Sequence, residues 1–575
     1  MITNVRGSAR TLAGMAVTAM LAIGTAATGV SPAANGLPTS DCAVAFPEAD
    51  LVPGDPVTGL TVTKGTTPDG FTGQVLGVVS DGIAPGIDMI MVRLTSPEID
   101  RVGGIWSGMS GSPVYADDGR LIGAVSYGLA VGPSTVAGVT PFEAMDDYLP
   151  APAVRVKVNA GTARRIAARA DVTAAQAAGG FAQLKMPIGV SGVGARRLQE
   201  LTGRSWLPKN TYAAGVTAPG AGPGAESIVA GGNLAAGASY GDITLGGVGT
   251  ATSVCGDKVV GFGHPLFFLG RTTSTLMPAD AIYIQEDPTT APFKVANIAA
   301  PVGTITDDRT AGITGTFGVL PDTIGVTSTV TFGARSRTGS TEVSVPLAAP
   351  SVTLYELIAN HERVIDGMIA GSELQTWQIS GHGPAGAPWT LSVTDRYAAT
   401  EDITGEVPWD VADAVYLLDQ LPGVSITDVT VKGRVTDDSS TYSFAKVLQR
   451  RGGVWQTVSR TNPIQGRAGR TVNLRVVLSS ASGTRNVPLK VVLPAASAGS
   501  RGQLSLTGGA YLFDESEPPT TLNQALRRYR SLVRNDEIQA DLFLEGPRRP
   551  FESSSVAGPA DKVVKGFRNV PVRVS

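Results

Sequence analysis

The stretch Gly108-Met109-Ser110-Gly111-Ser112-Pro113 has the glycines of a tight turn, and an apolar run at 121–127 follows it. Throughout residues 42–150, short apolar runs alternate with turn signals such as Asp118-Gly119. This pattern is typical of short strands joined by turns. The 575 residues include 71 glycines and 38 prolines without a collagen period, so we expect a mainly β protein.

The length predicts several domains, because one domain usually takes about 100–200 residues. Residues 471–493 alternate apolar and polar side chains with a period of two, which favours an antiparallel sandwich. Helices are expected near 351–369, 411–421 and 522–533. The expected units are a signal peptide at 1–34, a β region at 42–150, a helical linker or insertion at 151–212, a second β region at 213–345, a mixed α/β connector at 346–423, a β-sandwich-like module at 424–510, and a C-terminal helix with strands at 511–575.

The composition excludes several classes of protein. Charged residues make up 17 % of the chain and the net charge is −3, so a polybasic nucleic-acid binder is excluded. Hydrophobic residues at 42 % are enough for packed cores. With 3 histidines and 2 cysteines, a multi-zinc or iron–sulfur protein is excluded, and we expect no metal and no cofactor.

The N-terminus has the features of a secretory signal. Arg6 and Arg10 precede an apolar run at 12–30, and the small residues Ser31-Pro32-Ala33-Ala34 follow. We expect cleavage near Ala33 or Ala34 and a secreted or cell-envelope protein; the alternative is a retained membrane anchor. No later segment approaches twenty uninterrupted apolar residues, so no stable membrane insertion is expected after signal removal.

In an exported chain, the two cysteines Cys42 and Cys255 are expected to form one disulfide. Such a bond would tie the mature N-terminus to the middle of the chain. The alternative is two unrelated thiols.

The hexapeptide at 108–113 resembles the Gly-x-Ser-Gly-x-Pro loop of chymotrypsin-like peptidases. A serine nucleophile must sit on a tight turn, and the N–H groups of Gly108 and Ser110 can converge there on a developing oxyanion. Glycine at 108 and 111 lets the backbone come close to a substrate carbonyl. The α/β-hydrolase elbow is excluded, because it needs glycine where Ser112 stands. The competing interpretation is a glycine-rich hairpin turn.

A serine nucleophile needs a base, and only three histidines are available. His264 ends a strand-like run between Gly263 and Pro265, His361 lies in an expected helix, and His382 lies in an expected loop. We favour His264, because its setting is the most constrained. The sequence does not favour a metal-dependent hydrolase, since the three histidines lack the spacing of metal ligands.

At these residues the chain resembles the SpoIVB-type serine peptidases, the family of the sporulation stage IV B peptidase. The resemblance covers residues 45–320 most strongly, and it implies a chymotrypsin-like double β-barrel and an endopeptidase that acts on a protein or peptide. It implies Ser110 as nucleophile and His264 as general base, with the peptidase domain divided between 42–150 and 213–345. The strings that carry it include Leu51-Val52-Pro53-Gly54, Gly108-Met109-Ser110-Gly111-Ser112-Pro113, Gly249-Thr250-Ala251-Thr252, Gly261-Phe262-Gly263-His264-Pro265 and Val302-Gly303-Thr304-Ile305-Thr306-Asp307-Asp308-Arg309.

The chain departs from the family pattern at three points. Ser110 precedes His264, whereas the histidine comes first in the sporulation peptidase. The family's acidic residue is expected just upstream of the serine motif, but Thr95-Ser96-Pro97 has serine at that place, so three other aspartates remain as equal candidates for the catalytic acid. In addition, no PDZ module is recognised. The alternative function is therefore a non-catalytic secreted envelope or binding protein that keeps the peptidase fold. The three candidate acids are Asp88, Asp100 and Asp307.

Overall fold

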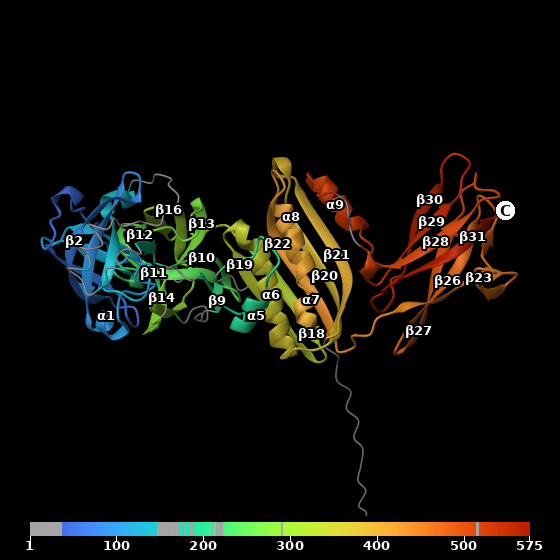
Figure 1. Ribbon diagram of the computed structural model, residues 1–575, viewed down its shortest axis with the longest axis horizontal. Coiled ribbons are helices and arrows are strands. Elements are labelled where there is room, and N and C mark those ends of the chain that lie inside the picture. The colour runs from blue at the N-terminus through green and yellow to red at the C-terminus, as the bar shows by residue number, and fades with distance from the viewer. Residues whose placement is uncertain are drawn as a thin grey trace, which may run out of the picture.

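The computed structural model describes residues 37–146, 167, 172–173, 175–176, 180–184, 188–209, 211–213, 222–288, 291–512 and 517–575. The expected signal peptide lies outside these residues, as does much of the expected helical insertion at 151–212. Among the described residues, no helix combines the length and the apolar character needed to cross a membrane. The protein is mainly β and elongated, and four blocks follow one another along its long axis (Figure 1).

The first block is a closed antiparallel barrel. In the described part of the chain, six strands join in the order β4-β1-β2-β3-β6-β5, and β5 pairs back with β4. The hydrophobic core inside it includes Trp106, Ile90 and Val125, all fully buried. The strands are β1 (Pro56–Thr61), β2 (Asp69–Ala84), β3 (Ile87–Thr95), β4 (Pro113–Tyr115), β5 (Leu121–Leu129) and β6 (Val136–Pro141), with the helices α1 (Pro97–Val102) and α2 (Phe142–Asp146) and the added strand β7 (Phe181–Gln183).

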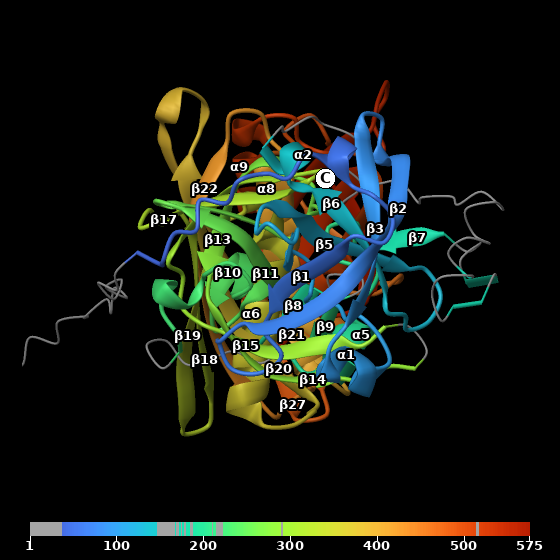
Figure 2. The same cartoon turned by 90° about the vertical axis from the view of Figure 1, so that its left-hand side faces the viewer.

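The second block is another closed barrel, which lies beside the first (Figures 1 and 2). Six described strands join in the order β10-β13-β16-β17-β12-β11, and β11 pairs back with β10. Its strands are β10 (Asn233–Gly241), β11 (Leu245–Cys255), β12 (Lys258–Gly261), β13 (Gly270–Met277), β16 (Gly303–Arg309) and β17 (Gly312–Phe317), and β8 (Ile188–Val190), β9 (Thr211–Ala213) and α5 (Ala195–Glu200) adjoin it.

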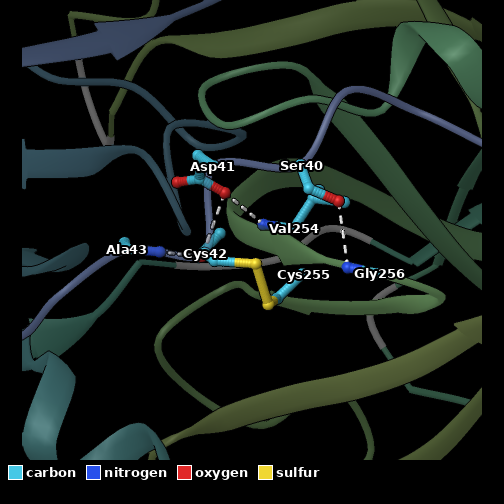
Figure 3. Close-up of a disulfide and its surroundings, with 8 residues drawn as sticks. Ser40, Asp41, Cys42, Ala43, Val254, Cys255 and Gly256 are labelled. Atoms are coloured by element: carbon cyan, nitrogen blue, oxygen red, sulfur yellow. Dashed lines mark hydrogen bonds between the residues drawn. A yellow bond between two sulfur atoms is a disulfide. The ribbon is translucent and has the colours of Figure 1, made fainter.

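A short N-terminal segment spans the two barrels. Cys42 forms a disulfide with Cys255 at the end of β11, and Asp41 accepts a hydrogen bond from the Val254 N–H at 2.7 Å (Figure 3). A few residues further on, the Phe46 N–H donates to the Leu121 carbonyl of the first barrel at 2.8 Å. The segment therefore connects the second barrel to the first by one covalent bond and several backbone contacts.

A separate hairpin lies against both barrels. It consists of β14 (Ala279–Gln285) and β15 (Phe293–Ile298), which form a two-stranded sheet of their own. Single bridges join it to the first barrel, from Ala281 to Gly65 and from Phe293 to Ser107. The hairpin therefore contacts the loop that carries Ser110.

The third block extends the sheet of the second barrel. β19 pairs with β10, and the added strands are covered by α6 and α8, whose apolar faces share one core with Val326, Ile379 and Val429. The helices expected near 351–369 and 411–421 are confirmed, within a few residues, as α6 and α8. The elements are β18 (Ile324–Phe332), β19 (Arg335–Val343), α6 (Ala349–Ile365), β20 (Gly371–His382), β21 (Pro388–Ala399), α7 (Ile403–Glu406), α8 (Trp409–Asp419) and β22 (Ser425–Thr436).

The fourth block is a β-sandwich, with boundaries that differ from those expected at 424–510. β22 belongs to the third block, because its alternating apolar residues pack under α6 and α8. Residues 538–574 supply strands to the sandwich, since Leu542 and Val572 share a core with Leu474. The expected helix near 522–533 is α9 (Leu522–Ser531), which packs on β21. The two sandwich sheets contain β23 (Ser443–Arg451), β24 (Val454–Thr457), β26 (Thr471–Ser480) and β27 (Gly483–Val492), and β25 (Ile464–Gly466), β28 (Arg501–Gly508), β29 (Ile538–Leu544), β30 (Phe551–Ala557) and β31 (Phe567–Val574).

Candidate active site between the two barrels

Ser110 lies on a tight turn between α1 and β4 of the first barrel. The Ser112 N–H donates to the Met109 carbonyl at 2.8 Å and closes the turn, while the buried Met109 side chain anchors it in the barrel core. Gly108 and Gly111 have φ angles of 106° and 97°, in the left-handed region that favours glycine. The two glycines thus permit the backbone shape that presents Ser110.

Strand β11 of the second barrel holds this turn from the other side. The Thr250 N–H donates to the Ser110 carbonyl at 2.8 Å, and the Thr250 hydroxyl donates to the Gly108 carbonyl at 3.0 Å. The Thr252 hydroxyl donates to the Gly111 carbonyl at 2.8 Å. A Cβ at Gly111 would overlap the Thr250 carbonyl oxygen, so glycine is needed for the two barrels to approach. Thr250 and Thr252 belong to one of the strings that carry the family resemblance, but no sequence pattern pointed to this role.

His264 follows β12 of the second barrel on a sharply turned backbone. Phe262 and Gly263 have φ angles of 67° and 68°, and two consecutive left-handed residues turn the chain immediately before the histidine. The Thr140 hydroxyl of the first barrel donates to the Gly263 carbonyl at 2.6 Å. A non-glycine residue with positive φ is strained, and the buried Phe262 ring provides the packing that retains it.

The turns bring Ser110 and His264 together across the barrel interface. Ser110 Oγ lies 2.7 Å from His264 Nε2, and His264 Nδ1 lies 2.8 Å from the Pro265 carbonyl oxygen. A histidine that accepts the serine proton at Nε2 carries its own proton on Nδ1, which then donates to the Pro265 carbonyl. Burial lowers the pKa of His264 to about 4, although the hydrogen bond to Pro265 opposes the shift. The imidazole is therefore neutral at physiological pH, as a general base must be.

Gln183 lies behind the His264 ring, where a catalytic acid would be expected. Its Nε2 lies 2.8 Å from His264 Nδ1 and donates to the Pro265 carbonyl at 2.9 Å. Gln183 ends β7, within the stretch that the sequence pattern assigned to a helical linker, so no sequence signal pointed to it.

None of the three aspartates considered from the sequence hydrogen-bonds to His264 among the described residues. Asp88 accepts from the Asp81 N–H, Asp100 accepts weakly from the Thr95 hydroxyl, and Asp307 pairs with Arg309. The histidine thus has neutral partners.

Asp308, the neighbour of Asp307, stabilises the loop that follows His264. Its carboxylate accepts from the Leu266 and Phe267 N–H groups, each at 2.8 Å. Burial raises the pKa of Asp308, while these backbone hydrogen bonds oppose the rise. The residue positions the histidine loop without contacting the ring.

The Gly108 and Ser110 N–H groups are the expected oxyanion donors. Both residues are buried, and neither N–H donates to any residue in the described part of the chain. Buried N–H groups are nearly always paired, so two unpaired ones beside a serine indicate a place for an incoming acceptor.

Lys294 of β15 covers this loop, and no sequence pattern predicted this contact. A Cβ built on Gly108 would lie 2.7 Å from Lys294 Cβ and 3.5 Å from its Cδ and Cε, and the Lys294 ammonium donates to Asn233 Oδ1 at 2.8 Å. Burial lowers the pKa of Lys294 to about 7.

The other two histidines lie elsewhere. His361 on α6 is buried, with Nε2 2.7 Å from Glu373 Oε2 and Nδ1 2.6 Å from the Leu357 carbonyl. His382 is at the exposed end of β20 rather than in a loop. Within the described residues, no group of three or more histidine, cysteine, aspartate or glutamate side chains is arranged to hold a metal ion.

Comparison with known proteins gives no relative: no family model, no curated protein and no solved structure matches this chain. The site must therefore be interpreted from its own geometry.

Proposed function

We propose that the protein is a serine hydrolase, and more specifically a secreted SpoIVB-type endopeptidase with a chymotrypsin-like arrangement of its two barrels. The observation that carries the proposal is the 2.7 Å contact between Ser110 Oγ and His264 Nε2, with one residue from each barrel. The unpaired N–H groups of Gly108 and Ser110 beside it support the proposal.

The proposed reaction follows from these positions. His264 Nε2 accepts the Ser110 proton while Oγ attacks the carbonyl carbon of a peptide bond. The oxyanion accepts hydrogen bonds from the Gly108 and Ser110 N–H groups, and the imidazolium returns the proton to the leaving amine. Water, activated by the same histidine, then releases the acyl group from Ser110.

The neutral surroundings of His264 predict a slow or highly selective enzyme. The Nδ1–H of the imidazolium formed in the reaction can donate to the Pro265 carbonyl, whereas the neighbouring Gln183 Nε2 is itself a donor and cannot accept from it. Among the described residues, no carboxylate takes this place. Loss of the carboxylate partner in a serine triad typically lowers turnover by about 10⁴-fold. The proposed substrate is a protein or peptide outside the cytoplasm, where the expected signal would send the chain.

The test is labelling with a fluorophosphonate followed by a peptide-cleavage assay. We expect the native chain to be labelled at Ser110, and Ser110→Ala to lose both labelling and cleavage. Ser112→Ala is the matched control, because Ser112 lies on the same turn and, among the described residues, its hydroxyl makes one long hydrogen bond, donated to the Thr250 hydroxyl at 3.5 Å. Cleavage that persists in Ser110→Ala would contradict the proposal.

The second candidate is a non-catalytic binding protein that keeps the peptidase-like architecture. It is favoured by one observation, the absence of a carboxylate beside His264 among the described residues. If Ser110 reacts with the fluorophosphonate neither in the native chain nor in Ser112→Ala, this second candidate is supported.

A further inference from the structure

The Ser110–His264 pair is closed to solvent. Ser110 is 1 % exposed and His264 is 0 % exposed. A reacting carbonyl has to come within about 3–3.5 Å of the nucleophile. Part of the protein must therefore move before a substrate can enter.

The β14–β15 hairpin is the element that covers the nucleophile turn. The Lys294 side chain lies along Gly108 and reaches Asn233 Oδ1, while Asn233 Nδ2 donates to the Gly65 and Ala279 carbonyls, each at 3.0 Å. The amide of Asn233 thereby links the second barrel to the hairpin and to the first barrel.

The hairpin also pairs with the nucleophile turn through its backbone. The Ser107 N–H donates to the Pro292 carbonyl and the Lys294 N–H donates to the Ser107 carbonyl, both at 2.8 Å. These are the two bonds that an extended peptide makes when it adds to a strand edge, and any extended peptide can make them. The segment 292–294 thus occupies a backbone edge three residues before the nucleophile.

We propose that this edge at Ser107 is a binding site for an extended peptide with a lysine side chain, and that the chain's own segment 292–294 occupies it while the hairpin is closed. The inference rests on the proposed function, because the peptide that replaces the segment would be the substrate. The lysine of that peptide would take the place of Lys294, between Gly108 and Asn233.

The polar contacts at the outer end of the hairpin are weak, and opening must in addition withdraw Ile284, which is fully buried in the core of the first barrel. Arg101 of α1 donates from Nη1 to Glu286 Oε1 at 2.9 Å and from Nη2 to the Ile284 carbonyl at 2.8 Å. Both charged side chains of this ion pair are largely exposed, and exposed ion pairs contribute little. Because β14 and β15 form their own sheet, opening breaks the single bridges to Gly65 and Ser107 but leaves the hydrogen-bond ladders of the barrels intact. Ala279 and Ile298, which are buried beside Met277, can remain in place as the base of the movement.

A thiol at position 110 measures the opening directly. Both native cysteines are in the disulfide, so Ser110→Cys introduces the single free thiol of the chain. We expect slow reaction with a maleimide, and a rate about threefold higher when Arg101→Ala is added, as the loss of an exposed ion pair and one hydrogen bond suggests. Arg204→Ala, which removes the exposed pair with Asp413 in the third block, is the matched control and should leave the rate unchanged. Equal rates with and without Arg101→Ala would overturn the proposal.

A free peptide tests the identity of the site. In the Ser110→Cys, Arg101→Ala chain, a synthetic peptide with the sequence of residues 291–297 should slow maleimide labelling. The same peptide with Lys294→Glu should not. Protection by neither peptide, or equal protection by both, would overturn the proposal.

These measurements are independent of peptidase chemistry, because the labelling rate of the thiol measures how accessible position 110 is and does not depend on catalysis. If the thiol responds as expected but native Ser110 never reacts with a fluorophosphonate, the proposed function fails and the peptide site remains. If native Ser110 reacts with a fluorophosphonate but the thiol labelling rate changes neither with Arg101→Ala nor with the peptide, the peptide site fails and the proposed function remains.

Discussion

The two buried histidines, His264 and His361, occupy opposite electrostatic environments. His264 lies between the barrels and contacts Ser110, Gln183 and the Pro265 carbonyl, all of them neutral. His361 lies under the sheet of the third block and contacts the Glu373 carboxylate. Burial lowers the pKa of His264 to about 4. Burial also opposes protonation of His361, but the charge and the hydrogen bond of Glu373 outweigh it and raise the pKa of that histidine.

The contrast shows why burial alone does not define a role for a histidine. A neutral imidazole beside a serine hydroxyl can accept a proton, whereas a carboxylate beside a buried histidine favours the protonated ring and pairs with it inside the core. The difference lies in the partners, so removing either histidine, or giving His264 a charged partner, should have different effects.

The largest effect is expected from His264→Ala. Removal of the base should lower fluorophosphonate labelling of Ser110 by about 10³-fold or more, because the hydroxyl then keeps its proton. The measurement is the labelling rate at neutral pH. His361→Ala is the control for losing a buried imidazole, and it should label at the native rate once folded. Loss of labelling in both variants would place the effect in folding and not in chemistry.

His361→Ala should instead act on stability. The variant leaves Glu373 in the core without its partner, and breaking a buried pair in this way costs about 3–5 kcal/mol. Urea unfolding followed by fluorescence measures the change. His382→Ala, at an exposed strand end, should change the free energy of unfolding by less than about 0.5 kcal/mol. A His361→Ala chain as stable as the native one would show that the pair contributes nothing.

A smaller effect is expected when His264 is given a charged partner like that of His361. Gln183→Glu places a carboxylate near His264 Nδ1, where it can accept the ring proton and stabilise the imidazolium. We expect labelling to rise by about tenfold, below the full 10⁴ that an evolved triad gains. Gln183→Ala, which removes the amide and adds no charge, is the control and should not raise it.

The same pair of chains should differ in pH dependence. In the native chain the base is neutral above a pKa of about 4, so labelling should fall as the pH decreases through that value. A carboxylate favours the protonated ring, so in Gln183→Glu the fall should begin at a pH about one to three units higher. Identical pH profiles would mean that residue 183 does not act on the ring.

Local patterns in the sequence predicted the elements with short-range causes. The alternation in residues 471–493 predicted β26 and β27, and the spacing of apolar residues on one face predicted α8. The helices expected near 351–369 and 522–533 correspond to α6 and α9. The glycines around Ser110 predicted a tight turn. Because the chain has three histidines, only three residues could be considered as the general base for Ser110.

Local sequence patterns were thus enough to predict a mainly β chain, a serine turn and three candidate bases, since strand alternation and turn residues act over a few positions. The surroundings of His264, in contrast, depend on long-range packing. Gln183, Thr140 and Lys294 come from separate parts of the chain, and their approach depends on how two barrels and a hairpin pack. The limits of the sandwich were likewise set by packing, because the alternation in β22 fits a core under helices as well as one between sheets. Long-range packing leaves no mark at any single position, and for that reason the neutral setting of the histidine and its cover were visible only in three dimensions.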